Sequence, residues 1–143
     1  MAMIAMVMAI ILFRHRYYYE KKTHLASRRE QRLFRYLNKI LPKDYHVHCQ
    51  SSLISLLVPA DLRSARMVWA KRMDYVITDA DTRILLVIEL DDPSHERKDR
   101  RKRDKFVNKT LNGKHPLLRL TTEQARDKVL VKRKIEQVLD DSD

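Results

Sequence analysis

The stretch MDYVITDADTRILLVIELDD, residues 73–92, has the clearest strand pattern in the chain. Residues 73–78 and 84–90 are rich in β-branched and aliphatic side chains, and the segment between them is rich in Asp and Thr. This pattern predicts two strands joined by a short turn. The second strand is almost continuously apolar, which is typical of a strand buried on both faces in the middle of a sheet.

Segments with helical character flank this hairpin on both sides. In the first of them apolar residues recur at spacings of three and four, and each of the three is bordered by a residue that caps or stops helices. The expected helices are residues 27–41, with Leu33, Phe34, Leu37, Ile40 and Leu41 on one stripe and Pro42 at the end, residues 97–112, stopped by Gly113, and residues 122–139, capped by Thr121 or Thr122.

Two further strands complete the expected sheet. Residues 45–50 alternate between polar and apolar side chains, and residues 116–120 are an apolar run that begins with a proline. Residues 52–58 either continue the first of these strands or form a short helix, and residues 61–71 are an irregular or helical connection. The order of elements predicts an α/β or α+β fold with a small mixed central β-sheet flanked by helices.

The composition narrows the class of protein. A chain of 143 residues fits one compact domain with an appendage, and its net charge of +11 suits a polyanionic partner, either nucleic acid or an anionic membrane surface. A solvated basic face is the alternative. Cys49 is the only cysteine and Gly113 the only glycine, which excludes an intramolecular disulfide, a cysteine cluster for metal and a glycine-rich phosphate loop.

The first 13 residues, MAMIAMVMAIILF, are wholly apolar, and basic residues and three tyrosines follow them. The run is shorter than the roughly 20 residues of a membrane span, but the tyrosines and the positive flank suit a membrane interface on the cytoplasmic side. A cleaved secretory signal would have its positive charge before the apolar run. We expect residues 1–22 to form a membrane anchor and residues 23–143 to form a cytoplasmic domain, with a core helix as the alternative for the apolar run.

Carboxylates gather where the buried strand ends. Glu89 and Asp91 lie on the same face because alternate residues of a strand do, and counting outward from the turn places Asp74 about level with Glu89. Buried carboxylates are costly unless they are paired or bind a metal. Asp74, Glu89 and Asp91 are therefore candidate ligands of Mg²⁺ or Mn²⁺. Alternatively, they are the polar end of a strand, neutralised by the basic helix that follows.

The helix expected at residues 97–112 is densely basic. Its cations repel one another, and a phosphate backbone would relieve that repulsion. Asp104 precedes Val107 by three residues, so we expect it to face the sheet as a structural acid. The candidate nucleic-acid-binding residues are Arg97, Lys98, Arg100, Arg101, Lys102, Arg103 and Lys105, together with Arg119 of the last strand, which either reaches a phosphate or pairs with Asp104.

Glu30 has two compatible interpretations. It lies at the edge of the apolar face of the first helix, four residues before Phe34 and seven before Leu37, where it is a candidate site residue. With Ser27 it also forms the S-x-x-E pattern of a capping box.

Residues 72–120 resemble the family of domain of unknown function 2726. The resemblance rests on a strand aspartate, a motif of the form IELDD-x-SH, a basic stretch that ends in K-R-D, and a strand of the form LLR. Upstream, an E-x-x-x-F-x-x-L pattern and a V-x-x-Q pattern fit as well. In this chain the strand aspartate is Asp74, the IELDD-x-SH motif is residues 88–95, K-R-D is residues 102–104 and LLR is residues 117–119. The two upstream patterns are Glu30 with Phe34 and Leu37, and Val47 with Gln50.

That family resembles in turn the restriction-endonuclease-like PD-(D/E)xK superfamily of nucleases. The resemblance implies a restriction-endonuclease-like fold in which Asp74 and Glu89 bind the metal and Glu30 is the acid of the first helix. The lysine that the superfamily carries two residues after the second acid is replaced here by Asp91. In the superfamily that lysine helps to position or deprotonate the attacking water. In this chain His95 or Lys105, or the metal alone, would do so.

Three functions are compatible with these residues. The first is a Mg²⁺-dependent nuclease that acts on DNA and is tethered to the inner face of a membrane, with Asp91 as third ligand or water-orienting group and His95 as base or phosphate contact. The second is a non-catalytic nucleic-acid-binding module, which the missing lysine favours. The third is a membrane-surface protein that binds anionic lipid through residues 1–13 and the basic helix, with structural carboxylates.

Overall fold

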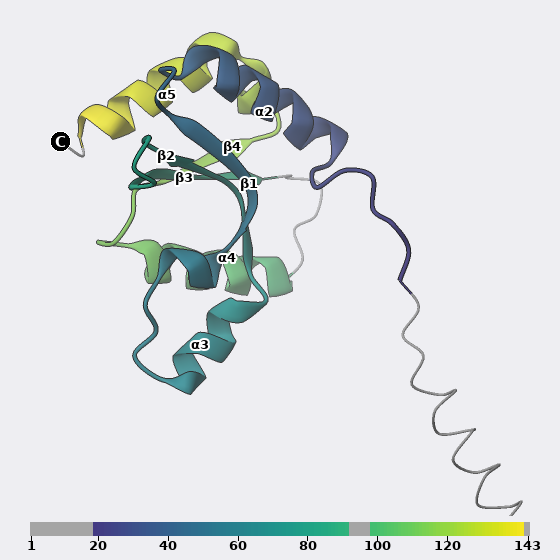
Figure 1. Cartoon of the computed structure of the whole chain (residues 1–143), viewed down its shortest axis with the longest axis vertical. Coiled ribbons are helices and arrows are strands. Elements are labelled where there is room, and N and C mark those ends of the chain that lie inside the picture. Colours follow the sequence, from purple (N-terminus) through teal and green to yellow (C-terminus); the bar gives the residue numbers. More distant parts are fainter. Residues whose placement is uncertain (1–18, 92–97, 142–143) are drawn as a thin grey trace, which may run out of the picture.

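The computed structural model describes residues 19–91 and 98–141, which fold into helices packed on a central sheet (Figure 1). The elements in chain order are α2 (Arg28–Ile40), β1 (His46–Ser52), the 3₁₀ helix η1 (Leu53–Leu56), α3 (Leu62–Trp69), β2 (Arg72–Thr78), β3 (Ile84–Asp91), α4 (Lys98–Leu111), β4 (Leu117–Thr121), the 3₁₀ helix η3 (Gln124–Arg126) and α5 (Lys128–Asp140).

The sheet has four strands in the order β1-β2-β3-β4. The pairs β1–β2 and β2–β3 are antiparallel, and β3–β4 is parallel, with α4 as the crossover between the two parallel strands. β3 is an inner strand, and Leu86, Val87 and Ile88 are fully buried within it. The expected mixed sheet and the central position of its most apolar strand are confirmed.

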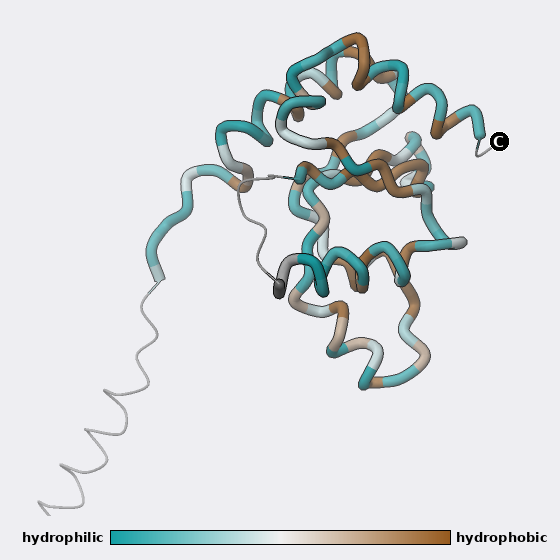
Figure 2. The backbone as a smooth tube through the Cα atoms, turned by 180° about the vertical axis from the view of Figure 1, so that it is seen from behind, coloured by the Kyte–Doolittle hydropathy of each residue, from teal (hydrophilic) through white to brown (hydrophobic). Residues whose placement is uncertain are grey.

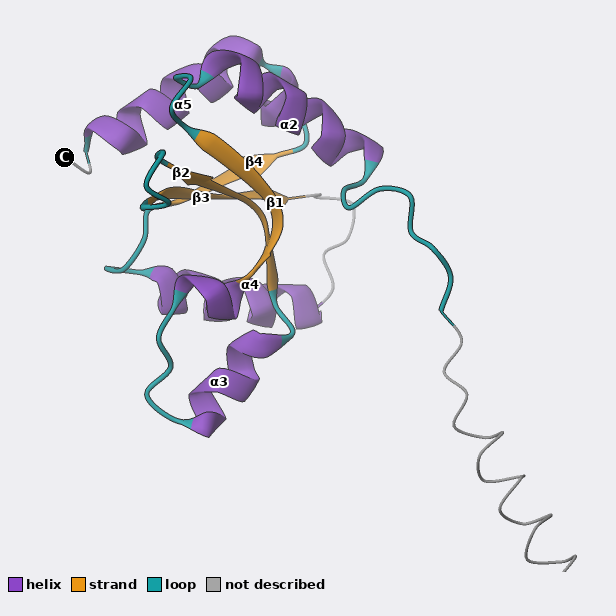
Figure 3. Ribbon diagram, in the orientation of Figure 1, coloured by secondary structure: helices purple, strands orange, loops and turns teal. Residues whose placement is uncertain are grey.

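Helices cover both faces of the sheet, α2 and α5 on one side and α3 and α4 on the other (Figure 3). The alternation of the strands supplies a separate core to each face. Tyr75 and Ile88 pack with residues of α2 and α5, whereas Val76 and Val87 pack with residues of α3 and α4. The apolar stretches consequently run along the strands in the middle of the molecule (Figure 2).

The expected signals at two helix ends are confirmed. Ser27 caps α2 with its side chain, which accepts a hydrogen bond from the backbone N–H of Glu30, and the Glu30 carboxylate accepts one from the backbone N–H of Ser27. Gly113 follows the end of α4 with a φ of +69°, a left-handed conformation that glycine adopts at little cost. The carbonyl of Leu111 there accepts a hydrogen bond of 2.9 Å from Lys114.

The expected start of the last helix is wrong. α5 begins at Lys128 and is capped by Asp127, whose carboxylate accepts a hydrogen bond from Leu130. Thr122 cannot cap it because its backbone N–H and its hydroxyl both bond to the carbonyl of Asp91, at 3.0 and 3.3 Å. Those bonds extend the pairing with β3. The chain then makes the short helix η3, before which the Thr121 hydroxyl accepts a hydrogen bond of 3.1 Å from the backbone N–H of Gln124.

The apolar residues 1–13 lie outside the described residues, and so does the rest of the expected anchor up to residue 18. Within residues 19–91 and 98–141, no helix is both long enough and apolar enough to cross a membrane.

Candidate functional site

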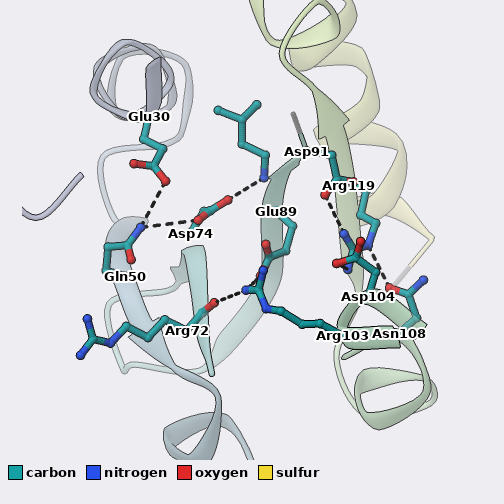
Figure 4. Close-up of polar contacts among 11 residues, drawn as sticks. Glu30, Gln50, Arg72, Asp74, Glu89, Asp91, Arg103, Asp104, Asn108 and Arg119 are labelled. Carbon is teal, nitrogen blue, oxygen red and sulfur yellow. Dashed lines mark hydrogen bonds and ion pairs between the residues drawn. The ribbon is translucent and has the colours of Figure 1, made fainter. Parts of the chain in front are cut away.

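A row of four polar residues crosses the sheet, one from each strand (Figure 4). Glu89 of β3 is paired with Arg119 of β4. The registers of the two antiparallel pairs place Asp74 of β2 opposite Glu89 and Gln50 of β1 opposite Asp74. Glu89 and Arg119 contact residues of α4, and Asp74 shares their face of the sheet as the residue opposite Glu89. The prediction that Asp74 lies level with Glu89 is confirmed.

An irregularity in the pairing of β2 with β3 sets this alignment. The register shifts by one residue between Ile77 and Thr78, which leaves an extra residue on β3. Without that shift, Asp74 would lie opposite Ile88 instead of Glu89. β-bulges are frequent beside active sites, where they re-aim a side chain. This one brings two carboxylates level with each other.

Asp74 is held in place by the neighbouring strand. Its Oδ2 accepts a hydrogen bond of 2.8 Å from the backbone N–H of Leu90. Burial raises the pKa of Asp74 above its ordinary range and the nearby charge of Glu30 raises it further, while the Leu90 N–H opposes the rise. The carboxylate is therefore fixed in position but costly to ionise, and a cation beside it would lower that cost.

Glu89 is the more costly of the two acids to ionise. It is only 4% exposed, and its Oε1 has no hydrogen-bond partner in the part of the chain that the structure describes. Burial, with a smaller effect from the charge of Asp74, raises the pKa of Glu89 to about 8. A buried polar atom without a partner is rare in folded proteins and calls for an explanation, of which a bound ion is one.

Arg103 of α4 is the cation beside Glu89. Its Nη2 lies 3.8 Å from Oε1 of Glu89, which is too far for a hydrogen bond, and donates instead to the carbonyl of Arg72 at 3.1 Å. The guanidinium lowers the pKa of Glu89 without offsetting the effect of burial. The sequence pattern grouped Arg103 with the phosphate-binding cations of the helix. The structure turns it toward the carboxylates, although 39% of its side chain is exposed.

Gln50 joins the row to the first helix and was not among the expected site residues. Its Nε2 donates to Oε1 of Glu30 at 3.3 Å and to Oδ1 of Asp74 at 3.5 Å. Its φ of +54° is rare for a residue other than glycine and is often found at functional sites. The V-x-x-Q pattern was the only signal for it in the sequence. Glu30 thus both caps α2 and reaches the edge of the site.

Asp91 lies with Arg119 and apart from the other two carboxylates. Nη1 of Arg119 is 2.8 Å from Oδ1 of Asp91, Nη2 is 3.4 Å from Asp104, and Nε donates to Asn108 at 2.9 Å. The expected pairing of Arg119 with Asp104 is confirmed. Because the guanidinium is engaged by three partners, it is not available as a phosphate contact in this arrangement.

The expected set of three carboxylate ligands is not assembled. No group of three His, Cys, Asp or Glu side chains is placed to hold a metal within residues 19–91 and 98–141. The ion pair with Arg119 explains the position of Asp91. What the structure brings together is the pair Asp74 and Glu89, with Glu30 and Gln50 at one side and Arg103 at the other.

The remaining expected site residues belong to the basic helix and the loop before it. His95 and Arg97 lie outside the described residues, and only the backbone of Lys98 and Arg100 is described. Three expected phosphate contacts are exposed on α4, namely Arg101, Lys102 and Lys105.

Comparisons with known proteins identify the family of the chain without assigning it an activity. No curated protein and no solved structure matches it. A family model described as "Protein of unknown function (DUF2726)" matches residues 22–139, which include every element of the sheet and all the residues of the row. The chain therefore belongs to the DUF2726 family of proteins of unknown function.

Proposed function

We propose that this domain is a divalent-metal-dependent nuclease that acts on DNA, with Asp74 and Glu89 as ligands of Mg²⁺ or Mn²⁺. The observation that carries the proposal is the buried Oε1 of Glu89, which lacks a hydrogen-bond partner in the described chain and belongs to a side chain opposite Asp74. Carboxylate oxygens are the ligands these hard cations prefer. The resemblance of the motif to the PD-(D/E)xK nucleases supports the same assignment.

The protein groups around the two acids fit the chemistry of phosphodiester hydrolysis. A cation bound there would activate water and stabilise negative charge on a phosphate. The backbone N–H of Leu90 fixes the carboxylate of Asp74, and the amide of Gln50 positions the same group from the other side. Glu30 adds a third carboxylate at the edge, reached through Gln50.

Arg103 takes the place of the missing lysine as the cation beside the acids. It sits against Glu89 and remains partly exposed, so it can also neutralise charge on a phosphate. A guanidinium is protonated at any physiological pH and cannot accept a proton from water. Arg103 would therefore position the phosphate and stabilise its negative charge, and the attacking water would lose its proton to another group.

Binding of DNA is supported by charge. The net charge of +11 is large for 143 residues, and exposed cations of α4 lie on the face of the sheet that carries the acids. Cations of this kind bind the phosphate backbone without distinguishing one sequence from another.

A cleavage assay tests the proposal. The chain should cut plasmid or oligonucleotide DNA in Mg²⁺ or Mn²⁺ but not in EDTA. Glu89→Gln and Asp74→Asn should abolish cleavage while leaving DNA affinity within about threefold, because the basic residues that dominate affinity are unchanged. Glu136→Gln, which makes the same change on the exposed side of α5, should cut like the wild type. Undiminished cleavage by Glu89→Gln would refute the assignment.

A non-catalytic nucleic-acid-binding module is the second candidate. It is favoured by Asp91, which stands where the nucleases that the motif resembles carry a lysine and which is paired with Arg119. Such a module would bind DNA equally in EDTA and in Mg²⁺ and would give no products at any protein concentration. Saturable metal binding at Asp74 and Glu89 together with metal-dependent cleavage would exclude it.

The proposed nuclease is tethered to the cytoplasmic face of a membrane by residues 1–13. The support for the tether is the sequence of that segment and its basic, tyrosine-rich flank. Removal of residues 1–13 should move the protein from the membrane fraction of a cell lysate to the supernatant. Recovery of both forms in the same fraction would argue against a tether.

A further inference from the structure

A second basic site lies on the other face of the sheet. A pocket of about 280 Å³ opens between α2, α5 and the end of β3, in the layer shown at the top of Figure 1. Four cations line it, two from α2, one from η3 and one from the first position of α5, and no acidic residue does. They are Arg29, Arg32, Arg126 and Lys128.

Two of the four cations in this pocket have no ionic partner among the described residues. The side chains of Arg32 and Arg126 are exposed and make no hydrogen bond or ion pair with any described residue. Lys128 lies over the ring of Tyr36, 5.7 Å from its centre, and its carbonyl accepts a hydrogen bond from the Tyr36 hydroxyl at 2.6 Å. Several like charges around one pocket favour binding of an anion.

The lining of the pocket also has apolar residues. Leu33, Tyr36 and Ala125 line it together with the cations. Cations beside apolar surface suit a phosphate that is attached to a sugar and a base, because the apolar atoms of the nucleotide can pack against these side chains.

The pocket adjoins the carboxylate row across the end of the sheet. Leu90, which lines it, lies between Glu89 and Asp91 in β3, and its N–H is the one that holds Asp74. Thr122, also in the lining, bonds to the carbonyl of Asp91. The acids face α4 on one side of the sheet, and the pocket faces α2 and α5 on the other.

We propose that this pocket binds the phosphodiester backbone of the nucleic acid, next to the phosphate presented to Asp74 and Glu89. The inference rests on the proposed function for the position of the reacting phosphate. A nucleic-acid strand that passes over the end of the β-sheet would meet the cations of α4 on one face of the sheet and the cations of the pocket on the other face. The carboxylates would lie between these two sets of cations.

The test measures DNA binding in EDTA, where no cleavage occurs, with the 143-residue chain and a fluorescent DNA oligonucleotide. The double variant Arg32→Gln/Arg126→Gln removes the two uncompensated cations from the pocket. Its affinity should fall by about tenfold or more, and the slope of log K against log salt should flatten by about 2, because two fewer phosphates are neutralised. The matched control is Arg63→Gln/Arg66→Gln, which removes two exposed cations from α3 in the opposite layer.

Equal reductions in the affinity of the pocket variant and the α3 control would overturn the inference, because they would reflect net charge alone. Vesicles that contain phosphatidylserine provide a second arm. If the pocket variant no longer binds vesicles but still binds DNA, the phosphate belongs to lipid and the inference also fails. Failure of the nuclease proposal can be distinguished from failure of this inference. If the protein never cleaves DNA but its DNA binding depends on the pocket, the nuclease proposal fails and the inference about the pocket holds.

Discussion

Asp74 and Glu89 lie opposite each other on two antiparallel strands, and the residue after Glu89 donates its backbone N–H to Asp74. The distance between the two carboxylates is thus determined largely by the sheet and its register shift. Sites built on strands hold their geometry more closely than sites built on loops. Two acids fixed in this way are suited to hold one cation.

The metal-free protein should become less stable as the pH rises through neutrality. Burial raises the pKa of Glu89 from 4.5 to about 8, with Asp74 and Asp91 adding to the rise and Arg103 and Arg119 opposing it. Between these two pKa values the folded chain keeps a proton that the unfolded chain has released, so the free energy of unfolding falls as pH rises. We expect a fall of roughly 1 kcal/mol per pH unit, measured by urea denaturation in EDTA.

Glu89→Gln removes the group that contributes most to this dependence, and the smaller contribution of Asp74 remains. The free energy of unfolding of that variant should change much less between about pH 5 and about pH 8 than that of the wild type. Glu136→Gln, on the exposed side of α5, should retain the wild-type dependence. If the Glu89 variant and the wild type show the same slope, the buried carboxyl group does not titrate in this range.

Substitutions at Gln50 should separate backbone strain from the hydrogen bonds that its amide makes. Gln50→Gly and Gln50→Ala both remove the hydrogen bonds to Glu30 and Asp74, but only glycine adopts a φ of +54° without cost. The glycine variant should therefore be more stable than the alanine variant by about 1 kcal/mol in thermal or urea unfolding. Both should show a similar decrease in nuclease activity. Full activity in the glycine variant would assign Gln50 a backbone role only.

Arg119 should contribute more to stability than an exposed ion pair does. Arg119→Ala leaves two half-buried carboxylates, Asp91 and Asp104, without their partner, and we expect the free energy of unfolding to fall by about 1–3 kcal/mol. Lys132→Ala breaks a solvent-exposed pair with Glu136 and should cost less than about 0.5 kcal/mol. Equal effects of the two substitutions would mean that the ion pairs of Arg119 are as weak as those at the surface.

The hairpin and the level of its two acids were predictable from the sequence because both depend on local features. The apolar run of β3 and the polar turn before it fix the two strands and bring Asp74 near Glu89. The extra residue on β3 places Asp74 directly opposite Glu89. Counting residues from the turn could place the two acids only approximately opposite each other. The signals for Ser27 and Gly113 are equally local, and both agree with the structure.

The parts of the site that depend on how distant elements dock were not predictable. Gln50 reaches Asp74 through the pairing of β1 with β2, whose strands are separated by η1 and α3. Arg103 precedes the buried residues Val107 and Leu111 by four and eight positions, so the helical spacing puts it on the side of α4 that faces the sheet. The sequence pattern did not show which carboxylate it would meet, because that depends on how α4 docks on β3. Asp91 shares a face with Glu89, but a cation on a strand that follows much later in the chain takes it as its partner.

The metal site is best tested by calorimetric titration of Mn²⁺ into the wild type and into Glu89→Gln, because this measurement detects metal binding without requiring the right DNA substrate. We expect one saturable binding event in the wild type that is absent in Glu89→Gln and in Asp74→Asn, and kept in Glu136→Gln. Identical titrations of the wild type and Glu89→Gln, whether both bind the ion or neither does, would contradict this expectation.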